Sequence, residues 1–251
     1  MSSRPVVLVT GAARRVGAEI ARRLHAAGAR VAIHYRNSAG AAAELAATLN
    51  AARPGLDAES AAIFAADLLD TEALPQLVES VVAHFGQLDA LVNNASSFFA
   101  TRVGAVDTAA WDDLIGSNLK APLFLAQAAA PHLERSGGSI VNITDIHAER
   151  PLRGYPLYCA AKAGLLGLTR ALALELGPRV RVNAVAPGAI EWPQDTNDFP
   201  PEARAAIIQH TLLKRVGSPA DIARTVKFLV FDAPYVTGQV INVDGGRTAY
   251  L

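Results

Sequence analysis

Short apolar runs alternate with longer segments of helical periodicity along almost the whole chain, and this alternation limits the folds available to it. The apolar runs are PVVLVT, ARVAIHY, ESAAIFAA, DALVNNAS, GGSIVNIT, VRVNAVAPG and GQVINVDGG. Continuous apolar runs of this length are typical of strands buried on both faces, as in parallel sheets. We therefore predict an α/β protein, a single-domain Rossmann-type doubly wound parallel sheet of about seven strands with helices on both faces.

The length and charge of the chain fit one domain that binds a small molecule. A chain of 251 residues can bury one large core, and no linker or repeat divides it, so we predict a single domain over residues 1–251. Lys and Arg number 23, as do Asp and Glu, which predicts no nucleic-acid or anionic-membrane surface. The segment EWPQDTNDFPPEA, rich in Pro, Asp and Asn, predicts a mobile surface loop and a lid over about residues 189–213.

Sequence patterns favour a cytoplasmic location. Each apolar run is interrupted by Arg, Glu, Pro or Gly before it reaches the length of a membrane span. The apolar stretch near the N-terminus is too short for a secretory signal. The one cysteine, Cys159, excludes an intramolecular disulfide framework and is ordinary in a reducing compartment. We therefore expect a cytoplasmic protein without a membrane segment or a metal site.

The first predicted strand leads into a glycine turn and then a helix, which is the context of a phosphate-binding loop. In GAARRVG, Gly11 permits a tight turn and Gly17 permits close helix packing, so the helix N-terminus stays open to a pyrophosphate. Arg15 stands between them, where many such loops carry a glycine. Because a simple strand–helix connection can look the same, the interpretation depends on the next strand.

That next strand ends in Arg36, Asn37 and Ser38, which favours NADP over NAD. NAD-binding folds place an acidic residue about 20 residues after the glycine loop, whereas NADP is accommodated by an arginine there. No Asp or Glu occurs between Glu19 and Glu44. Arg36 and Ser38 can bind a 2′-phosphate, and the alternative is a solvated loop arginine.

Tyr158 and Lys162 stand four residues apart in a segment of helical periodicity, so both side chains are expected on one helix face. A lysine cation about 4 Å from a phenol favours the phenolate by up to about 4 kcal/mol at an effective dielectric constant of about 20. Lys162 is therefore expected to lower the pKa of Tyr158, which could then transfer a proton near neutral pH. Tyr155 has Cys159 four residues on and is the poorer candidate. Taken alone, the pair could also be an accident of helix spacing.

Polar residues gather where the predicted strands end. Parallel sheets bind ligands at the carboxyl ends of their strands, so we predict one shared site near Gly11, Arg36, Asp67, Asn93, Asp145 and Pro187. Asp67 would cap the next helix or contact an adenine. Asn118, in the middle of a helical run, is expected to bend the helix or to bond a specific partner. Phe98 either fills the core or forms a stacking platform.

The motifs TGAARRVG, NNAS, Asn118, YCAAK and PG occur in this order, and with them the chain resembles the short-chain dehydrogenase/reductase superfamily from end to end. Within that superfamily, four features are similar to the pteridine reductases. They are Arg15 in place of the middle glycine of the loop, Asp145 thirteen residues before Tyr158 where most members have serine, the strand end NNASSF, and HYRNSA.

The resemblance implies NADPH or NADP lying across the strand ends. Its pyrophosphate would lie on the turn that opens with Gly11, and its 2′-phosphate near Arg36 and Ser38. Asn37 stands where pteridine reductases can carry a second basic residue. The implied cofactor-binding residues are Gly11, Arg14, Arg15, Val16, Tyr35, Arg36, Asn37, Ser38, Asp67, Leu68, Asn94, Ala95, Ser96, Tyr158, Lys162, Pro187 and Gly188.

The resemblance also implies a homotetramer that acts on a pterin or folate, with the pterin ring stacked between the nicotinamide and Phe98 and Arg15 near its polar edge. The implied substrate-binding residues are Arg15, Ser96, Phe98, Asp145 and Tyr158, and the catalytic residues are Asp145, Tyr158, Lys162 and Asn118. Our hypothesis is that hydride passes to a ring carbon while Tyr158 and Asp145 protonate the neighbouring nitrogen. For Asp145, the alternative is a loop aspartate that caps the turn before Arg150.

Two other functions remain open on the sequence alone. A reductase of a small ketone or a 3-oxoacyl thioester would share the cofactor, but would have lost the usual serine at the position of Asp145. A non-catalytic NADPH-binding protein would not need to keep Tyr158, Lys162 and Asn118. His34 is a further candidate acid or base, although a histidine at a strand end is usually bonded locally. His147 has the same two interpretations, an acid or base and a locally bonded histidine.

Overall fold

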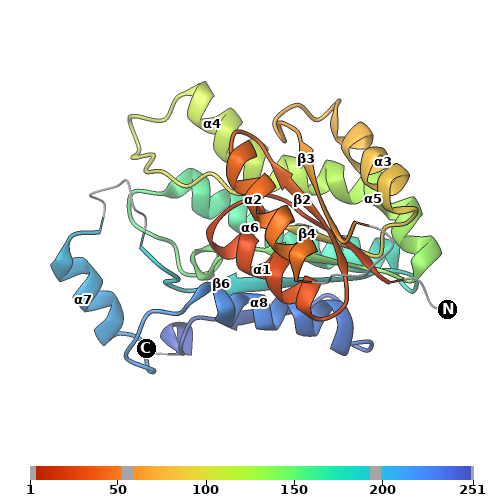
Figure 1. Ribbon diagram of the computed structural model, residues 1–251. Helices are drawn as coiled ribbons and strands as arrows, with labels where there is room; N and C mark the ends of the chain where they lie inside the picture. The colour runs from red at the N-terminus through yellow and green to blue at the C-terminus, as the bar shows by residue number, and fades with distance from the viewer. Residues whose placement is uncertain (1–3, 53–58, 193–198, 250–251) are drawn as a thin grey trace.

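The computed structural model describes residues 4–52, 59–192 and 199–249 (Figure 1). Within them, seven strands form one parallel sheet in the order β3-β2-β1-β4-β5-β6-β7. The predicted doubly wound α/β fold is confirmed. The strands are β1 Val6–Val9, β2 Arg30–Tyr35, β3 Ala61–Ala65, β4 Ala90–Asn93, β5 Ser139–Ile143, β6 Arg181–Pro187 and β7 Val240–Val243.

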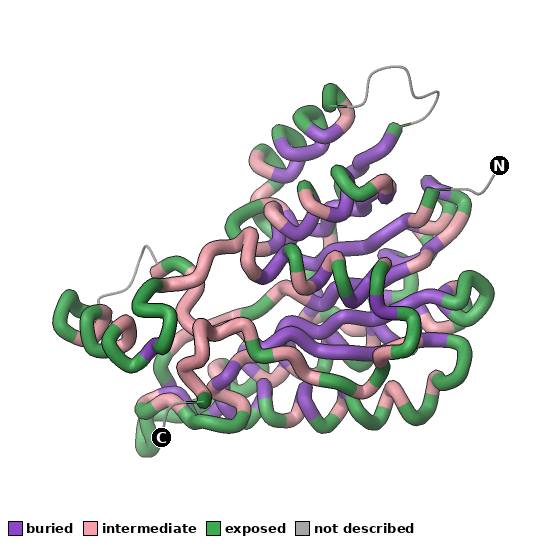
Figure 2. The backbone as a smooth tube through the Cα atoms, turned by 90° about the horizontal axis from the view of Figure 1, so that it is seen from below, coloured by how far each residue is buried: buried purple, intermediate pink, exposed green. Residues whose placement is uncertain are grey.

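Helices cover both faces of the sheet, because successive residues of a buried strand point to opposite sides. Val7 and Val9 of β1 pack into one apolar core, whereas Val6 and Leu8 pack into the other. Figure 2 shows that the middle of the fold is buried and that exposed residues lie around it. The first core is completed by α1 Arg15–Ala26, α2 Ala39–Ala51 and α8 Pro219–Lys227. The second is completed by α3 Leu74–Phe85, α5 Ala121–Ser136 and α6 Pro156–Leu176.

The helix α6 carries the predicted Tyr158 and Lys162 and packs against the sheet. Among the described helices, α6 alone has the length and the apolar composition of a membrane-spanning helix. Half of the residues in its most apolar stretch are buried inside the protein. Tyr158 and Lys162 are both buried, although one is polar and the other charged. Their burial places both groups inside the fold rather than in solvent.

Local sequence signals explain where two helical segments begin and bend. Ser218 and Asp221 form a capping box at the start of α8. Between α4 Thr108–Ile115 and α5, residues Gly116–Lys120 form a π-helical turn. Asn118 lies in that turn, so the expectation that it disturbs the helix is confirmed.

The predicted lid over residues 189–213 is only partly an irregular loop. Residues 193–198 lie outside the described residues, whereas Pro201–Gln209 form the helix α7, which has no buried residue. The part beginning at Pro201 is therefore a helix at the surface, and its role as a lid stays a prediction. A proline is favourable in a first helical turn, but a helix without a buried face leaves no apolar periodicity in the sequence.

Gly17 allows α1 to approach the preceding turn closely. Gly11 has a φ of +59°, a conformation that favours glycine. A Cβ atom at Gly17 would overlap the carbonyl oxygen of Gly11 and would lie 2.6 Å from Nδ2 of Asn94. Neither neighbour can yield easily, because one is backbone and the other is held by hydrogen bonds to the turn.

Gly17→Ala should therefore destabilise the protein by about 1–3 kcal/mol, through overpacking, and weaken dinucleotide binding. Gly40→Ala is the matched control, because a Cβ at Gly40 in α2 meets nothing within 4 Å. It should leave the unfolding free energy unchanged or raise it by about 0.5 kcal/mol. Urea denaturation measures both effects, and equal stability of the two variants would contradict the packing argument.

Candidate active site

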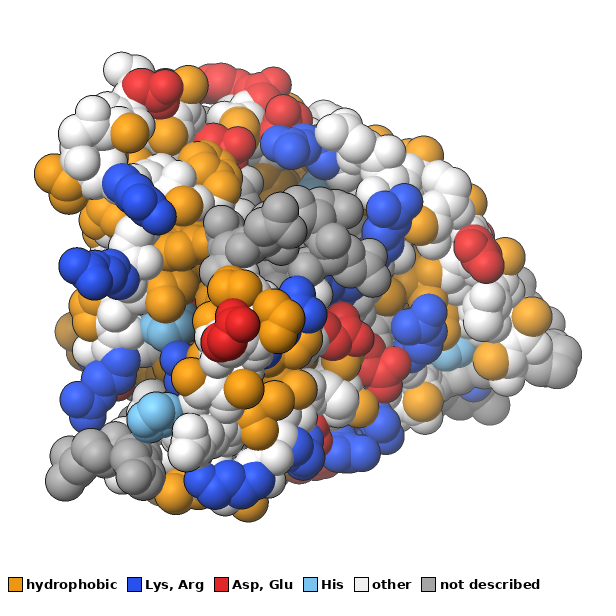
Figure 3. All heavy atoms as spheres, turned by 90° about the vertical axis from the view of Figure 1, so that its left-hand side faces the viewer, with side chains coloured by type: hydrophobic (Ala, Val, Ile, Leu, Met, Phe, Trp, Pro, Cys, Tyr) orange, Lys and Arg blue, Asp and Glu red, His pale blue; other side chains and the backbone are white. Residues whose placement is uncertain are grey.

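A pocket of about 540 Å³ opens at the carboxyl ends of the strands. Figure 3 faces the side of the molecule on which α7 and the C-terminal residues lie, and Lys and Arg side chains are spread over it. Most of the predicted site residues line this one cavity, so the expected convergence at the strand ends is present. These residues are Gly11, Arg14, Arg15, Val16, Arg36, Asp67, Leu68, Asn94, Ala95, Ser96, Phe98, Asp145, Tyr158, Lys162, Pro187 and Gly188.

Five predicted residues do not line the pocket: Tyr35, Asn37, Ser38, Asn93 and Asn118. Ser38 is the residue before α2, and its hydroxyl makes no capping hydrogen bond with that helix. Asn118 is almost completely buried, at 1% exposure, and its Oδ1 accepts a 2.6 Å hydrogen bond from Ser96. Its Nδ2 donates to the backbone oxygens of Leu114 and Ser97, so Asn118 ties the π-helical turn to the loop after β4.

The glycine turn is fixed from two sides. Asn94 donates through Nδ2 to the backbone oxygens of Thr10, at 2.9 Å, and Gly11, at 3.2 Å. Thr10 in turn accepts hydrogen bonds at Oγ1 from the backbone amides of Asn94 and Ala95. These contacts hold the turn open at the N-terminus of α1, which is the place where a helix binds a pyrophosphate.

His34 fixes the other side of the same turn. Its Nδ1 accepts from the amide of Gly11 at 3.1 Å, and its Nε2 donates to the carbonyl oxygen of Ala66 at 3.2 Å. A carbonyl can only accept, so the proton of the neutral ring lies on Nε2. Burial lowers the pKa of His34 to about 4, against the hydrogen bond to Ala66 and the charge of Asp67, which raise it. The expectation of a locally bonded histidine is confirmed.

Arg36 and Asp67 lie at neighbouring strand ends, with Nη1 and Oδ1 3.8 Å apart. Both side chains are about half exposed at the pocket. Asp67 also accepts a 3.0 Å hydrogen bond from the amide of Leu69, so its carboxylate stabilises the following turn. The arrangement leaves a guanidinium beside the expected position of the adenosine ribose.

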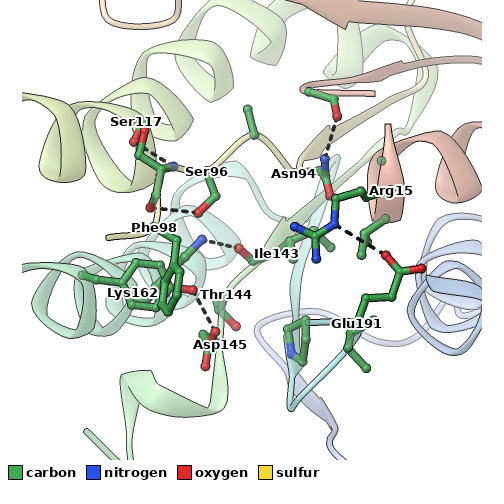
Figure 4. Close-up of a pocket in the computed structure, with 18 of the residues that line it drawn as sticks. Arg15, Asn94, Ser96, Phe98, Ser117, Ile143, Thr144, Asp145, Lys162 and Glu191 are labelled. Atoms are coloured by element: carbon green, nitrogen blue, oxygen red, sulfur yellow. Dashed lines mark hydrogen bonds and ion pairs between the residues drawn. The ribbon is translucent and has the colours of Figure 1, made fainter. Parts of the chain in front are cut away.

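Asp145, just after β5, and Lys162, on α6, lie on the same side of the pocket (Figure 4). The hydroxyl of Tyr158 donates to Oδ2 of Asp145 at 2.7 Å. The other carboxylate oxygen of Asp145 accepts from the amide of His147 at 2.8 Å and caps a short helical turn. One oxygen of Asp145 therefore caps the turn while the other bonds the phenol, and the catalytic role of Asp145 stays a prediction.

The expectation that Lys162 lowers the pKa of Tyr158 is wrong for this arrangement. Nζ of Lys162 donates to the backbone oxygen of Ile143 at 2.9 Å and lies 5.7 Å from the centroid of the Tyr158 ring. Burial, and then the negative charge of Asp145, raise the pKa of Tyr158 well above its ordinary value. Tyr158 is therefore held as a neutral phenol that can donate a proton. Burial lowers the pKa of Lys162 to about 8, and the charge of Asp145 opposes this shift.

Phe98 serves both as part of a small core and as a wall of the pocket. Its ring stacks on Tyr155, with 4.6 Å between centroids and 11° between planes, and meets Tyr158 edge-on at 4.8 Å. The three rings belong to one apolar cluster with Leu114 and Cys159. Packing on both tyrosines fixes an aromatic side chain beside the phenol that carries the proton.

Part of the segment predicted as a lid, after β6, lines the pocket, but the sequence did not predict which of its side chains do so. Glu191, Trp192 and Phe199 line it, and Glu191 forms an ion pair with Arg15. A segment rich in Pro, Asp and Asn carries no periodicity from which to predict which side chains face inward. Arg247, near the C-terminus, also lines the pocket and was not predicted.

Comparisons with known proteins agree with this geometry. A family model described as Enoyl-(Acyl carrier protein) reductase matches residues 11–248. A crystal structure described as a short-chain alcohol dehydrogenase from Sinorhizobium meliloti 1021 has a TM-score of 0.91 and 35% sequence identity, covering 99% of this chain and 98% of that one. The sheet order, the glycine turn and the Tyr158–Lys162 pair thus define a dinucleotide-dependent oxidoreductase.

Three relatives with different names are similarly close. A protein described as ketoacyl reductase 2 of the granaticin polyketide synthase, from Streptomyces violaceoruber, is 40% identical, covering 96% of this chain and 95% of the relative. Pteridine reductase 1 of Leishmania tarentolae is 39% identical, covering 96% of both. The 3-oxoacyl-(acyl-carrier-protein) reductase of Staphylococcus epidermidis is 38% identical, covering 95% and 97%. The chain belongs to the short-chain dehydrogenase/reductase family.

Protonation of His34, which bonds the glycine turn, should make the free energy of unfolding depend on pH. Because folding lowers the pKa of His34 from about 6.5 to about 4, its contribution is fully present above pH 6.5 and is lost as the pH falls toward 4. The loss should be about 3 kcal/mol in the unfolding free energy. His34→Gln can keep the donor and the acceptor without titrating, so it should flatten this slope and retain dinucleotide binding.

Urea denaturation between pH 4 and 6.5 measures the slope. His210→Gln is the control, because it changes an exposed histidine at the C-cap of α7. It should keep the wild-type slope. An unchanged slope in His34→Gln would show that other groups cause the acid sensitivity.

Proposed function

We propose that the protein reduces a pterin, such as a dihydropterin or dihydrofolate, with NADPH. The observation that carries this proposal is the 2.7 Å hydrogen bond between Tyr158 and Asp145. A carbonyl reductase needs a hydroxyl donor to polarise the substrate oxygen, whereas reduction of a ring C=N bond needs a proton at nitrogen. A carboxyl beside the phenol suits the second reaction. The fixed ring of Phe98 supports stacking of a planar substrate.

Each residue has a separate task in this reaction. NADPH, when bound, supplies a hydride to the ring carbon of the C=N bond. Tyr158, held as a phenol, donates its proton to the ring nitrogen. A proton from bulk solvent then passes through Asp145 to the tyrosine oxygen, so the net reaction consumes one hydride and one solvent proton. Lys162, whose buried amine donates to the backbone oxygen of Ile143, holds the start of α6 against the end of β5 and so positions Tyr158.

NADPH fits the residues at the far end of the pocket. Arg36 offers a cation for the 2′-phosphate, and no acidic residue stands directly after β2 to bind a ribose hydroxyl. The loop hydroxyl of Ser38 is free of a capping role. In the proposed complex, Arg36 turns from Asp67 to the phosphate, and Gly11 with the N-terminus of α1 binds the pyrophosphate.

We also propose a cytoplasmic homotetramer. Three helices carry large exposed apolar side chains. The exposed fractions are 51% for Trp111 on α4, 39% for Leu123 on α5 and 86% for Leu174 on α6. Association of chains through these helices would remove the apolar surface from water.

Reduction of a 3-oxoacyl thioester or small ketone is the second candidate. It is supported by the ketoacyl and 3-oxoacyl reductases, which are as similar to this chain as the pteridine reductase is. A rate comparison separates the two candidates, using dihydropterin or dihydrofolate against an acetoacetyl thioester, each with NADPH. Turnover of the thioester alone would favour the second candidate.

Asp145→Ser should lower kcat for dihydropterin by about 100-fold, because it removes the group that returns the proton to Tyr158. The dissociation constant of NADPH should stay close to the wild-type value, since the glycine turn is untouched. Steady-state kinetics and a fluorescence titration of NADPH measure the two quantities. Undiminished pterin turnover would rule out the role given to Asp145.

Arg36→Gln should weaken NADPH binding by about 10-fold while changing NADH binding little, because it removes one charge-assisted hydrogen-bond donor to the 2′-phosphate. Arg22→Gln is the control, since Arg22 lies on the exposed side of α1 and does not line the pocket. Fluorescence titrations with both dinucleotides measure the preference. Equal losses for NADPH and NADH would remove Arg36 from the 2′-phosphate site.

A further inference from the structure

Two oppositely charged side chains face the pocket across from Asp145 and Lys162 (Figure 4). Arg15 lies at the start of α1, and Glu191 lies in the segment that follows β6. Nε of Arg15 is 3.5 Å from Oε2 of Glu191, and the two side chains are 49% and 45% exposed. The pair joins two walls of the pocket that are 176 residues apart in the sequence.

The backbone holds both residues in a conformation that is unfavourable for them. Arg15 has a φ of +51° and Glu191 a φ of +55°, in the left-handed region that favours glycine. Such conformations persist where the surrounding structure imposes them, and they cluster at ligand sites. An exposed ion pair contributes little to stability, so stability alone does not account for the arrangement.

The pair presents free donors and a free acceptor to a ligand. Arg15 directs Nε toward Glu191, and the guanidinium keeps the donors of Nη1 and Nη2 for another partner. Within the described residues, Glu191 is bonded through Oε2, and its Oε1 has no hydrogen-bond partner. A ligand with donors beside an acceptor would satisfy both side chains.

We propose that Glu191 and Arg15 together bind the pyrimidine edge of a pterin. This edge carries an exocyclic amine and an adjacent ring N–H, both donors, next to a carbonyl oxygen. A carboxylate accepts from the two donors and a guanidinium donates to the carbonyl, so the groups match in kind and in order. The inference rests on the proposed function, and it makes Glu191 a specificity-determining residue.

The place of the pair in the pocket suits the shape of this substrate. In a dihydropterin the reducible C=N bond belongs to the second ring, so the pyrimidine donors point away from the reacting carbon. Asp145, bonded to Tyr158, lies across the pocket from Glu191. The reacting bond can therefore face the proton donors while the amine faces the carboxylate.

The same contact disfavours ketones. A 3-oxoacyl thioester offers acceptors but no N–H donor to Glu191, so the carboxylate would lose water without gaining a partner. A site built to bond an N–H group rejects an analogue that lacks it far more strongly than an apolar pocket rejects a change of shape. Glu191 thus selects between the two classes of substrate that the relatives of this chain represent.

The test measures binding of dihydrobiopterin to the NADP⁺-loaded enzyme by calorimetry. Glu191→Gln should raise the dissociation constant by about 10-fold, because the amide turns a donor toward the amine of the ligand. The dihydrolumazine analogue, with oxygen in place of that amine, should lose affinity for the wild-type enzyme and regain part of it in the variant. NADP⁺ affinity should stay at the wild-type value.

Glu202→Gln is the matched control, since Glu202 is an exposed glutamate in the first turn of α7 that does not line the pocket. It should leave all three dissociation constants unchanged. If the wild-type enzyme binds dihydrobiopterin and Glu191→Gln binds it equally well, this inference is overturned and the proposed function stays intact. Failure of the wild-type enzyme to bind dihydrobiopterin would overturn both.

Discussion

The hydrogen bond from Tyr158 to Asp145 is the interaction on which the site depends. It forms only because the end of β5 and the start of α6 are held together, and the chain holds them by several contacts. Lys162 donates to Ile143 at the end of the strand, and the amide of Thr144 donates to Val185 on β6. Asp145 also caps the turn that follows. The acid–base pair is thus part of the packing of the sheet.

Burial decides the charges in this part of the fold. It raises the pKa of Tyr158 and lowers that of Lys162 to about 8, so the phenol keeps its proton while the amine remains mostly charged at neutral pH. The negative charge of Asp145 adds to the effect of burial on the pKa of Tyr158 and opposes the effect of burial on the pKa of Lys162, so it favours the protonated form of both groups. In the proposed function, Tyr158 donates the proton on one wall of the pocket, and Arg15 and Glu191 recognise the substrate on the other.

The sequence predicts the architecture well, because strand and helix alternation is a property of local patterns. It also predicts which strand ends meet, since Gly11, Asp67 and Asp145 follow from the geometry of parallel sheets. It does not predict contacts set by side-chain direction. Lys162 donates to a backbone carbonyl rather than facing the phenol oxygen, and Glu191 reaches Arg15 from 176 residues away. These two contacts depend on tertiary packing, which local sequence patterns do not predict.

A crystal structure of the enzyme with NADP⁺ and dihydropterin tests the central claim most directly. The account predicts a flat ring between Phe98 and the nicotinamide, with the hydroxyl of Tyr158 about 2.6–3.2 Å from the ring nitrogen and Asp145 still bonded to that hydroxyl. A complex in which the carboxyl of Asp145 turns away from the ligand, and no aromatic ring covers it, would contradict the assignment of a pterin substrate.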